Sequence, residues 1–225
     1  MIEMSDDGSI LRISNLKKGL DLSSVEQESV KALFIAGCSI NDFAFISDFP
    51  NLEKLIILDS RSEAWNTISG NQNVRILRLH TLRGKKGYLD KIDFLSTFPH
   101  VEYLYLNNFY ITKFPDVSCL PLLHTVLCSG RKLIDYSALE YAAKLKTFMG
   151  WCAADNHRTP AELFLPILKN PSLQEFEYTQ MFHVEEKKLD EYVRMLRPDI
   201  IYPINKVENG IVDISRGRKL AKVFF

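Results

Sequence analysis

The sequence predicts an α/β solenoid, built from a short repeat that runs through most of its 225 residues. The pattern V-x-x-L-x-L, in which x is any residue, occurs at residues 101–106. Related patterns begin at Val30, Leu52, Val74, Val101, Leu122, Leu145 and Leu173, so the starts are 22, 22, 27, 21, 23 and 28 residues apart. A period in this range is typical of solenoids, in which each repeat buries its apolar face against the next.

The segments between the predicted strands share a second pattern. It is an aspartate followed by an aromatic residue and, three positions later, an aliphatic one. The pattern occurs twice at the same distance before a strand: Asp42, Phe43 and Ile46 precede Leu52, and Asp135, Tyr136 and Leu139 precede Leu145. Two segments that match in type and in distance support one repeating unit rather than scattered leucines.

Residues 30–178 resemble the leucine-rich repeat proteins, in the class that includes internalin-like and phosphatase-regulator-like repeats. The resemblance rests on L-x-x-L-x-L followed by I-x-D-[FY], as in Ile40-Asn41-Asp42-Phe43. It implies a right-handed horseshoe of about seven repeats, with a parallel sheet on the concave side and irregular, 3₁₀ or short helical returns on the convex side.

One family feature is missing from the chain. The family usually has Asn three residues after the last strand leucine, where its side chain bonds backbone groups of neighbouring turns. The corresponding residues here are Cys38, Ser60, Leu82, Phe109, Gly130, Ala153 and Met181. We therefore expect turns that are less uniform than those of the family.

The chain is expected to form one domain over residues 1–225, with a cap at each end of the repeats. Residues 1–29 are assigned to the N-terminal cap, 30–180 to the repeats and 181–225 to the C-terminal cap. In the C-terminal cap, apolar residues at helical spacing from Val184 predict a helix that Pro198 ends. Asn209-Gly210 predicts a hairpin turn between two extended runs.

Composition indicates a cytoplasmic protein that binds neither nucleic acid nor a membrane. The 28 basic and 28 acidic residues balance, so no overall positive field would attract a polyanion. The first ten residues lack a basic and apolar signal sequence, and no apolar run is long enough to span a bilayer. The four cysteines form no C-x-x-C pair and suit a reduced, buried role.

The residues between the strand leucines are the candidate partner-binding residues. Side chains alternate along a strand, so these residues point away from the core and line the concave face. Many are apolar or aromatic, and a contiguous exposed patch of this kind indicates a contact surface. The predicted set is Phe34, Ile56, Leu58, Arg78, His80, Tyr103, Tyr105, Asn107, Val126, Met149, Trp151, Glu175 and Glu177.

These residues favour a non-enzymatic module that captures another protein on its concave face. Such a module could sequester or inhibit its partner, as an immunity protein does, or act as an adaptor. Two alternatives explain the same patch: contact between two copies in a homodimer, and cover by the caps or insertions. The insertions at 83–91 and 153–160 follow strands, and they either flank a shared site or are surface loops without a role in binding.

No residue pattern predicts catalysis, a cofactor or a metal. The histidines lack the spacing of a zinc site, and Gly84-Lys85-Lys86-Gly87 lacks the spacing of a phosphate-binding loop. The alternative function from another class is an enzyme, or a regulatory subunit of one, that uses the loop from Trp151 to Arg158, which contains Asp155 and His157.

Overall fold

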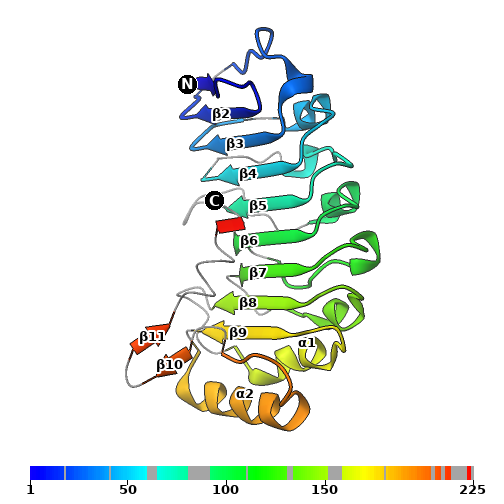
Figure 1. The fold of residues 1–225 in the computed structure, drawn as a ribbon, viewed down its shortest axis with the longest axis vertical. Helices are drawn as coiled ribbons and strands as arrows, with labels where there is room; N and C mark the ends of the chain where they lie inside the picture. Colours follow the sequence, from blue (N-terminus) through cyan, green and yellow to red (C-terminus); the bar gives the residue numbers. More distant parts are fainter. Residues whose placement is uncertain are drawn as a thin grey trace.

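A computed structural model describes residues 1–17, 19–40, 42–59, 65–80, 92–109, 111–130, 134–151, 159–179, 181–203, 206–208, 211–213 and 222–223. Several predicted features lie outside these residues: the insertion at 83–91, residues 153–158 of the second insertion, and the turn at Asn209-Gly210. In the described part, the strands stack along the long axis of the molecule in chain order (Figure 1).

Nine strands form one sheet in the order β1 to β9. They are β1 Ile2–Met4, β2 Ile10–Ser14, β3 Ala32–Ala36, β4 Lys54–Leu58, β5 Ile76–His80, β6 Tyr103–Phe109, β7 Thr125–Gly130, β8 Thr147–Trp151 and β9 Glu175–Thr179. Only the pair β1–β2 is antiparallel within this sheet, and each later pair is parallel. Strands β10 Lys206–Glu208 and β11 Ile211–Asp213 pair separately as the predicted hairpin.

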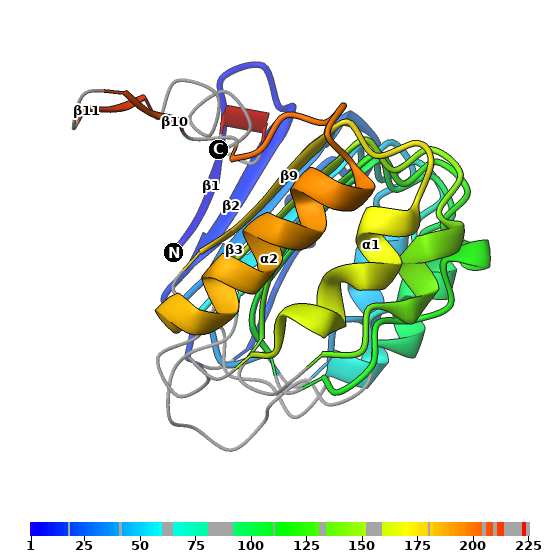
Figure 2. The same cartoon turned by 90° about the horizontal axis from the view of Figure 1, so that it is seen from below.

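Short helices connect the strands. The 3₁₀ helices are η1 Gln27–Ser29, η2 Ala44–Asp48, η3 Trp65–Thr67, η4 Asp93–Thr97, η5 Val117–Cys119, η6 Ser137–Tyr141 and η7 Ala161–Phe164. The α-helices are α1 Leu165–Lys169 and α2 His183–Leu196. Figure 2 shows the connecting helices and α1 together on one face of the sheet, which we call the covered face, while α2 lies across the end beside β9. We call the other sheet face the open face; it is the face predicted to be concave.

The aspartate of the repeated return has a local structural role. The Asp42 carboxylate accepts a hydrogen bond from the backbone N–H of Ala44 at 2.8 Å, and Asp135 accepts one from Ser137 at 2.8 Å. Each bond fixes the turn that starts a 3₁₀ helix, because a short acidic side chain can satisfy a backbone donor two residues later. The aromatic residue that follows, Phe43 or Tyr136, is then buried in the core.

The core lies between the sheet and the connecting helices. Inward side chains from neighbouring strands stack directly, as Leu33 does on Leu55 and Leu55 on Leu77. Phenylalanines from the returns, such as Phe49 and Phe98, fill the space behind them and are fully buried. Burial of each such side chain contributes about 1.5–3 kcal/mol, so the repeated columns supply most of the stabilisation.

The structure corrects the sequence register of one repeat. The prediction placed Val126 on the concave face and started its repeat at Leu122, but Val126 pairs with Leu104 and is fully buried in the core. Leu127 pairs with Tyr105 and takes the open-face position instead. The repeat therefore starts at Leu123, which is buried, and lies 22 residues after Val101 and 22 before Leu145.

Cys38 stands at one of the positions where the family usually has an asparagine. The Cys38 thiol lies 3.4 Å from the Ile13 carbonyl oxygen and 3.3 Å from that of Ala36, and the Leu16 N–H points to its sulfur at 3.5 Å. A thiol is a weaker donor and acceptor than an amide, but it bridges the same neighbouring turns. At this turn the cysteine thus makes the contacts between neighbouring turns that the asparagine would make, but more weakly.

Other parts of the chain lie beside the first and the last of the parallel strands. Strand β1 pairs with the outer edge of β2, and β2 is itself in parallel register with β3. At the other end, α2 buries Leu189 and Val193, and Ile201 forms a bridge with Glu175 on the edge of β9. The Arg197 guanidinium donates to the carbonyl oxygens of Leu168, Asn170 and Leu173. These backbone acceptors lie at the end of α1 and in the connection from α1 to β9, so Arg197 supplies them with hydrogen-bond donors.

The corrected register can be tested with two lysine substitutions in adjacent residues. Val126→Lys would bury an unpaired charge in the core and should unfold the chain or lower its stability by several kcal/mol. Leu127→Lys places the ammonium on the open face, where its long stem can reach solvent, and should leave a folded chain. Thermal unfolding followed by circular dichroism compares the two, and equal loss of stability would contradict the register.

A second prediction concerns Gly150, because the absence of a side chain there leaves room for the Tyr178 ring. A Cβ at position 150 would lie 2.5 Å from Cδ2 of Tyr178, whose ring packs on Phe164 with centroids 4.2 Å apart. Gly150→Ala should therefore lower the free energy of unfolding by about 1–3 kcal/mol, as overpacking does. In urea titrations, Tyr178→Leu should recover part of this loss in the Gly150→Ala background; purely additive effects would exclude the clash.

Candidate functional site

The strand register arranges the open face in three columns of side chains. The middle column holds Phe34, Ile56, Arg78, Tyr105, Leu127, Met149 and Glu177, one from each strand from β3 to β9. The flanking columns include Lys54, Tyr103, Thr125, Thr147 and Glu175 on one side, and Leu58, His80, Asn107, Ser129 and Trp151 on the other. Apart from Val126, the predicted residues all lie in these columns, and their role in binding stays a prediction.

The architecture is defined by three features. Parallel strands pair in a 22-residue register, apolar side chains form columns on the inward face, and the short connections between strands lie on that same face. The fold is a leucine-rich repeat solenoid. The two longer repeats keep this register, because Leu77 pairs with Leu104 and Phe148 with Phe176 across 27 and 28 residues. The extra residues lie in the connections and leave the sheet unchanged.

Comparison with solved structures finds similar repeat proteins at low identity. An internalin from Listeria monocytogenes is 15% identical over 76% of this chain, with a TM-score of 0.49. A leucine-rich repeat protein from Leptospira interrogans is 14% identical over 77% of this chain, with a TM-score of 0.43. In each case the match covers 54% of the solved chain, so this chain corresponds to about half of either structure. The sequence matches no protein-family model and no curated protein.

An aromatic cluster occupies the open face between β6 and β8. The rings of Tyr105 and Trp151 meet edge to face with centroids 5.8 Å apart, and Tyr103 lies 5.8 Å from the His124 ring. The two tyrosines, Trp151 and Met149 are half-buried. Small residues beneath and between them, Thr125, Ser129 and Thr147, are almost fully covered. The rings are therefore held in place by neighbours while one side of each stays accessible.

Arg78 connects this cluster to the N-terminal half of the open face. Its guanidinium carbon lies 4.9 Å from the centre of the Tyr105 ring, a cation–π contact, and the side chain is 7% exposed. Burial lowers the pKa of Arg78, and it raises the pKa of the Tyr105 hydroxyl, which the Arg78 charge partly opposes. Arginine remains charged, so a desolvated cation sits at the centre of this face.

His80 lies between Arg78 and an acidic neighbour, Asp59. Its Nδ1 lies 3.7 Å from Oδ1 of Asp59, the residue that directly follows β4. Burial lowers the pKa of His80, and Arg78 acts in the same direction, while the Asp59 carboxylate opposes them. Since desolvation is the largest cause, His80 favours the neutral form near neutral pH and acts there as a hydrogen-bonding group rather than a charge.

The N-terminal part of the open face is cationic and contacts the chain's own C-terminal end. Arg12 and Lys54 flank the Phe34 ring at 5.5 and 5.9 Å from its centre. The Lys54 ammonium donates a 3.0 Å hydrogen bond to the carbonyl oxygen of Val223. Burial, then repulsion from Arg78, lowers the pKa of Lys54. The chain itself therefore makes at least this one contact with the open face.

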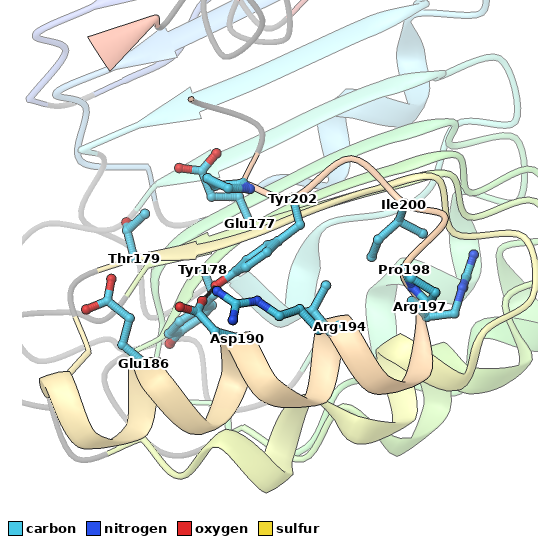
Figure 3. A pocket seen from close by; sticks show the side chains of 12 residues that line it. Glu177, Tyr178, Thr179, Glu186, Asp190, Arg194, Arg197, Pro198, Ile200 and Tyr202 are labelled. Carbon is cyan, nitrogen blue, oxygen red and sulfur yellow. Dashed lines mark hydrogen bonds between the residues drawn. The ribbon is translucent and has the colours of Figure 1, made fainter. Parts of the chain in front are cut away.

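The C-terminal end of the open face is acidic and continues into a pocket. Glu175 accepts a hydrogen bond from the Thr147 hydroxyl at 3.1 Å, and Glu177 beside it is 3% exposed. Glu177 and Thr179 also line a cavity of 660 Å³ between β9, α2 and the segment that follows α2 (Figure 3). In this pocket the Tyr202 hydroxyl donates to Asp190 at 2.5 Å, and burial, then this bond, raises the pKa of Tyr202.

Two features of this surface were missed from the sequence. Leu127 was assigned to the core, and the pocket beyond β9 had no sequence signal because α2 and Tyr202 come from the predicted cap. Of the loop proposed for an enzyme, residues 152 to 158 lie outside the part of the chain that the structure describes. Within the described part of the chain, no group of three His, Cys, Asp or Glu side chains is placed to hold a metal, and no helix is long and apolar enough to cross a membrane.

Proposed function

We propose that the chain is a non-enzymatic binding module that captures a protein partner on the open face. The observation that carries this proposal is the cluster of Tyr103, Tyr105, Met149 and Trp151, all half-buried on a sheet face that the connecting helices leave uncovered, with the Tyr105 and Trp151 rings in contact. Aromatic, Met and Arg side chains of this kind are enriched at the centres of protein interfaces. Rings already fixed by their neighbours lose little freedom when a partner binds.

Charged residues on either side of the cluster would favour one orientation of the bound partner. Arg12, Lys54 and Arg78 lie towards β2–β5, and Glu175 and Glu177 lie on β9. A partner with acidic groups over the first set and basic groups over the second would be favoured, and the reverse orientation would meet like charges. The proposed partner is therefore a protein with an apolar centre and opposite charges at its two ends.

Capture alone suffices for the two roles that we consider. A bound partner would be sequestered or inhibited, as a toxin is by an immunity protein, or held beside a third protein by an adaptor. The identity of the captured protein decides between these roles. Contact between two copies through the same face is the competing proposal, which size-exclusion chromatography with light scattering separates from capture of another protein.

A pull-down from native lysate tests the proposal with the double variant Tyr105→Asp/Trp151→Asp. Two carboxylates in the aromatic cluster should remove the central contacts, and loss of one such contact typically weakens binding by about 30-fold or more. We expect one protein to be retained by the unchanged chain and lost with the variant, as measured by quantitative mass spectrometry.

Tyr141→Asp is the matched control, because Tyr141 lies on η6 of the covered face and is 78% exposed. It should retain the partner at the level of the unchanged chain. Melting curves of the purified variants establish that each is folded. A set of retained proteins that is identical for the double variant and the unchanged chain would refute the assignment of this surface.

A further inference from the structure

The cavity beyond β9 adjoins the aromatic cluster of the open face. Its volume of 660 Å³ lies within the range of roughly 300–1,000 Å³ in which proteins bind small ligands. Glu177 and Thr179 form part of its wall, and in the sheet register they pair with Met149 and Trp151 of the cluster. Neighbouring strands are about 4.8 Å apart, so a ligand that lies on the cluster reaches the cavity without crossing another strand.

Three carboxylates line this cavity, on Glu177, Glu186 and Asp190. The Tyr202 hydroxyl lies where their charges act together. Figure 3 shows Tyr202 pointing from the segment after α2 towards Asp190, to which it donates at 2.5 Å. Burial is the largest cause that raises the pKa of Tyr202, followed by Asp190 and then by the charges of Glu186 and Glu177. The same negative charges that oppose a tyrosinate favour a cation in this cavity.

The basic residue Arg197 also lines the cavity, but its hydrogen-bonding groups are already used. A guanidinium has five N–H donors. Two of those of Arg197 donate to the Asp199 carboxylate at 2.9 Å, and the other three donate to the backbone carbonyl oxygens described above. Figure 3 shows Arg197 at the far end of the cavity from Glu186. In the described lining, exposed Arg194 is the remaining basic side chain against three carboxylates, so the cavity disfavours anions.

The rest of the lining is apolar, which distinguishes an organic cation from a metal ion. Val193 and Ile200 contribute aliphatic surface, and the Tyr202 ring is held against Phe176 with centroids 5.8 Å apart. Among the residues that the structure describes, no three His, Cys, Asp or Glu side chains are close enough to hold one metal ion. A lysine or arginine side chain, by contrast, combines an apolar stem with a charged head and matches both parts of the lining.

We propose that this cavity binds an organic cation with an alkyl stem, and that in the complex it takes an arginine or lysine side chain of the protein held on the open face. Glu177 and Asp190 pair with the charged head, and Val193 and Ile200 contact the stem. The second part of the proposal rests on the proposed function, because it requires a partner on the aromatic cluster. The first part concerns the cavity alone and is tested without a partner.

Titration of the full chain with butylguanidinium chloride, followed by the chemical shifts of its backbone amides, tests the cavity. N-butylurea is the control compound, since it has nearly the same shape and no charge. We expect the shift changes to lie in residues 177–179, 186–194 and 200–202. N-butylurea should bind at least about tenfold more weakly, the effect of losing a charged hydrogen bond. Equal binding of the two compounds, or shift changes elsewhere, overturn the proposal.

Two charge-removing variants assign the carboxylates. Glu177→Gln should weaken butylguanidinium binding about tenfold. Glu191→Gln is the matched control, because Glu191 is exposed on α2 and does not line the cavity, and it should leave the affinity unchanged. Asp190→Asn, which keeps an acceptor for Tyr202, replaces Glu177→Gln if melting curves show that variant to be unfolded. Affinities that are the same for the cavity variant and for Glu191→Gln overturn the assignment.

Elution from the immobilised chain tests the part that involves a partner. We expect butylguanidinium chloride to elute the protein that Tyr105→Asp/Trp151→Asp fails to retain, and sodium chloride with N-butylurea at the same concentrations to leave it bound. Glu177→Gln should retain less of this protein than Glu191→Gln. If that protein resists butylguanidinium and both Gln variants retain it equally, the partner's side chain does not enter the cavity. The titration result then stands, so the two parts fail separately.

Discussion

The stacking of equivalent residues on neighbouring parallel strands is the constraint on which the rest of the structure depends. Each strand from β2 to β8 pairs with the next so that inward side chains lie over inward side chains, and a slip by one residue would exchange the core and the open face. The connections therefore take up every irregularity in repeat length. The same constraint forms the surface, because once Leu104 and Leu106 point inward, Tyr103 and Tyr105 must point outward.

Most of the fold could be predicted because its signals are local and repeated. The strand pattern, the aspartate that starts a return and the hairpin strands each depend on residues close together in sequence. The one register error arose where two leucines, Leu122 and Leu123, were equally plausible starts. In three other repeats a proline stands two residues before the start, at Pro50, Pro99 and Pro171, and Pro121 points in the same way to Leu123. One apolar residue does not decide which of two adjacent positions faces the core. A second residue at a fixed distance from the repeat start, here the proline, does decide it.

The candidate site was less predictable than the fold, because its properties depend on contacts between distant residues. Alternation along the strands was enough to place Tyr105 and Trp151 on one face. It could not show that Arg78 stacks on Tyr105, that Asp59 lies next to His80, or that Lys54 donates to residue 223. The pocket beyond β9 depends in the same way on where α2 and Tyr202 pack. Burial and pKa changes follow from such contacts and carry no periodic signal in the sequence.

The open face therefore combines two halves with different physical costs of binding. At β6–β8 the rings are packed on small side chains and need little rearrangement to accept a partner, so their contact area translates efficiently into affinity. At β4 a partner that binds the Lys54 ammonium has to replace the hydrogen bond that Lys54 donates to the Val223 carbonyl oxygen. A ligand limited to the aromatic half would bind independently of that hydrogen bond. One that spans both halves has to offer the Lys54 ammonium an acceptor in place of the Val223 carbonyl oxygen, which favours ligands with such a group at this position.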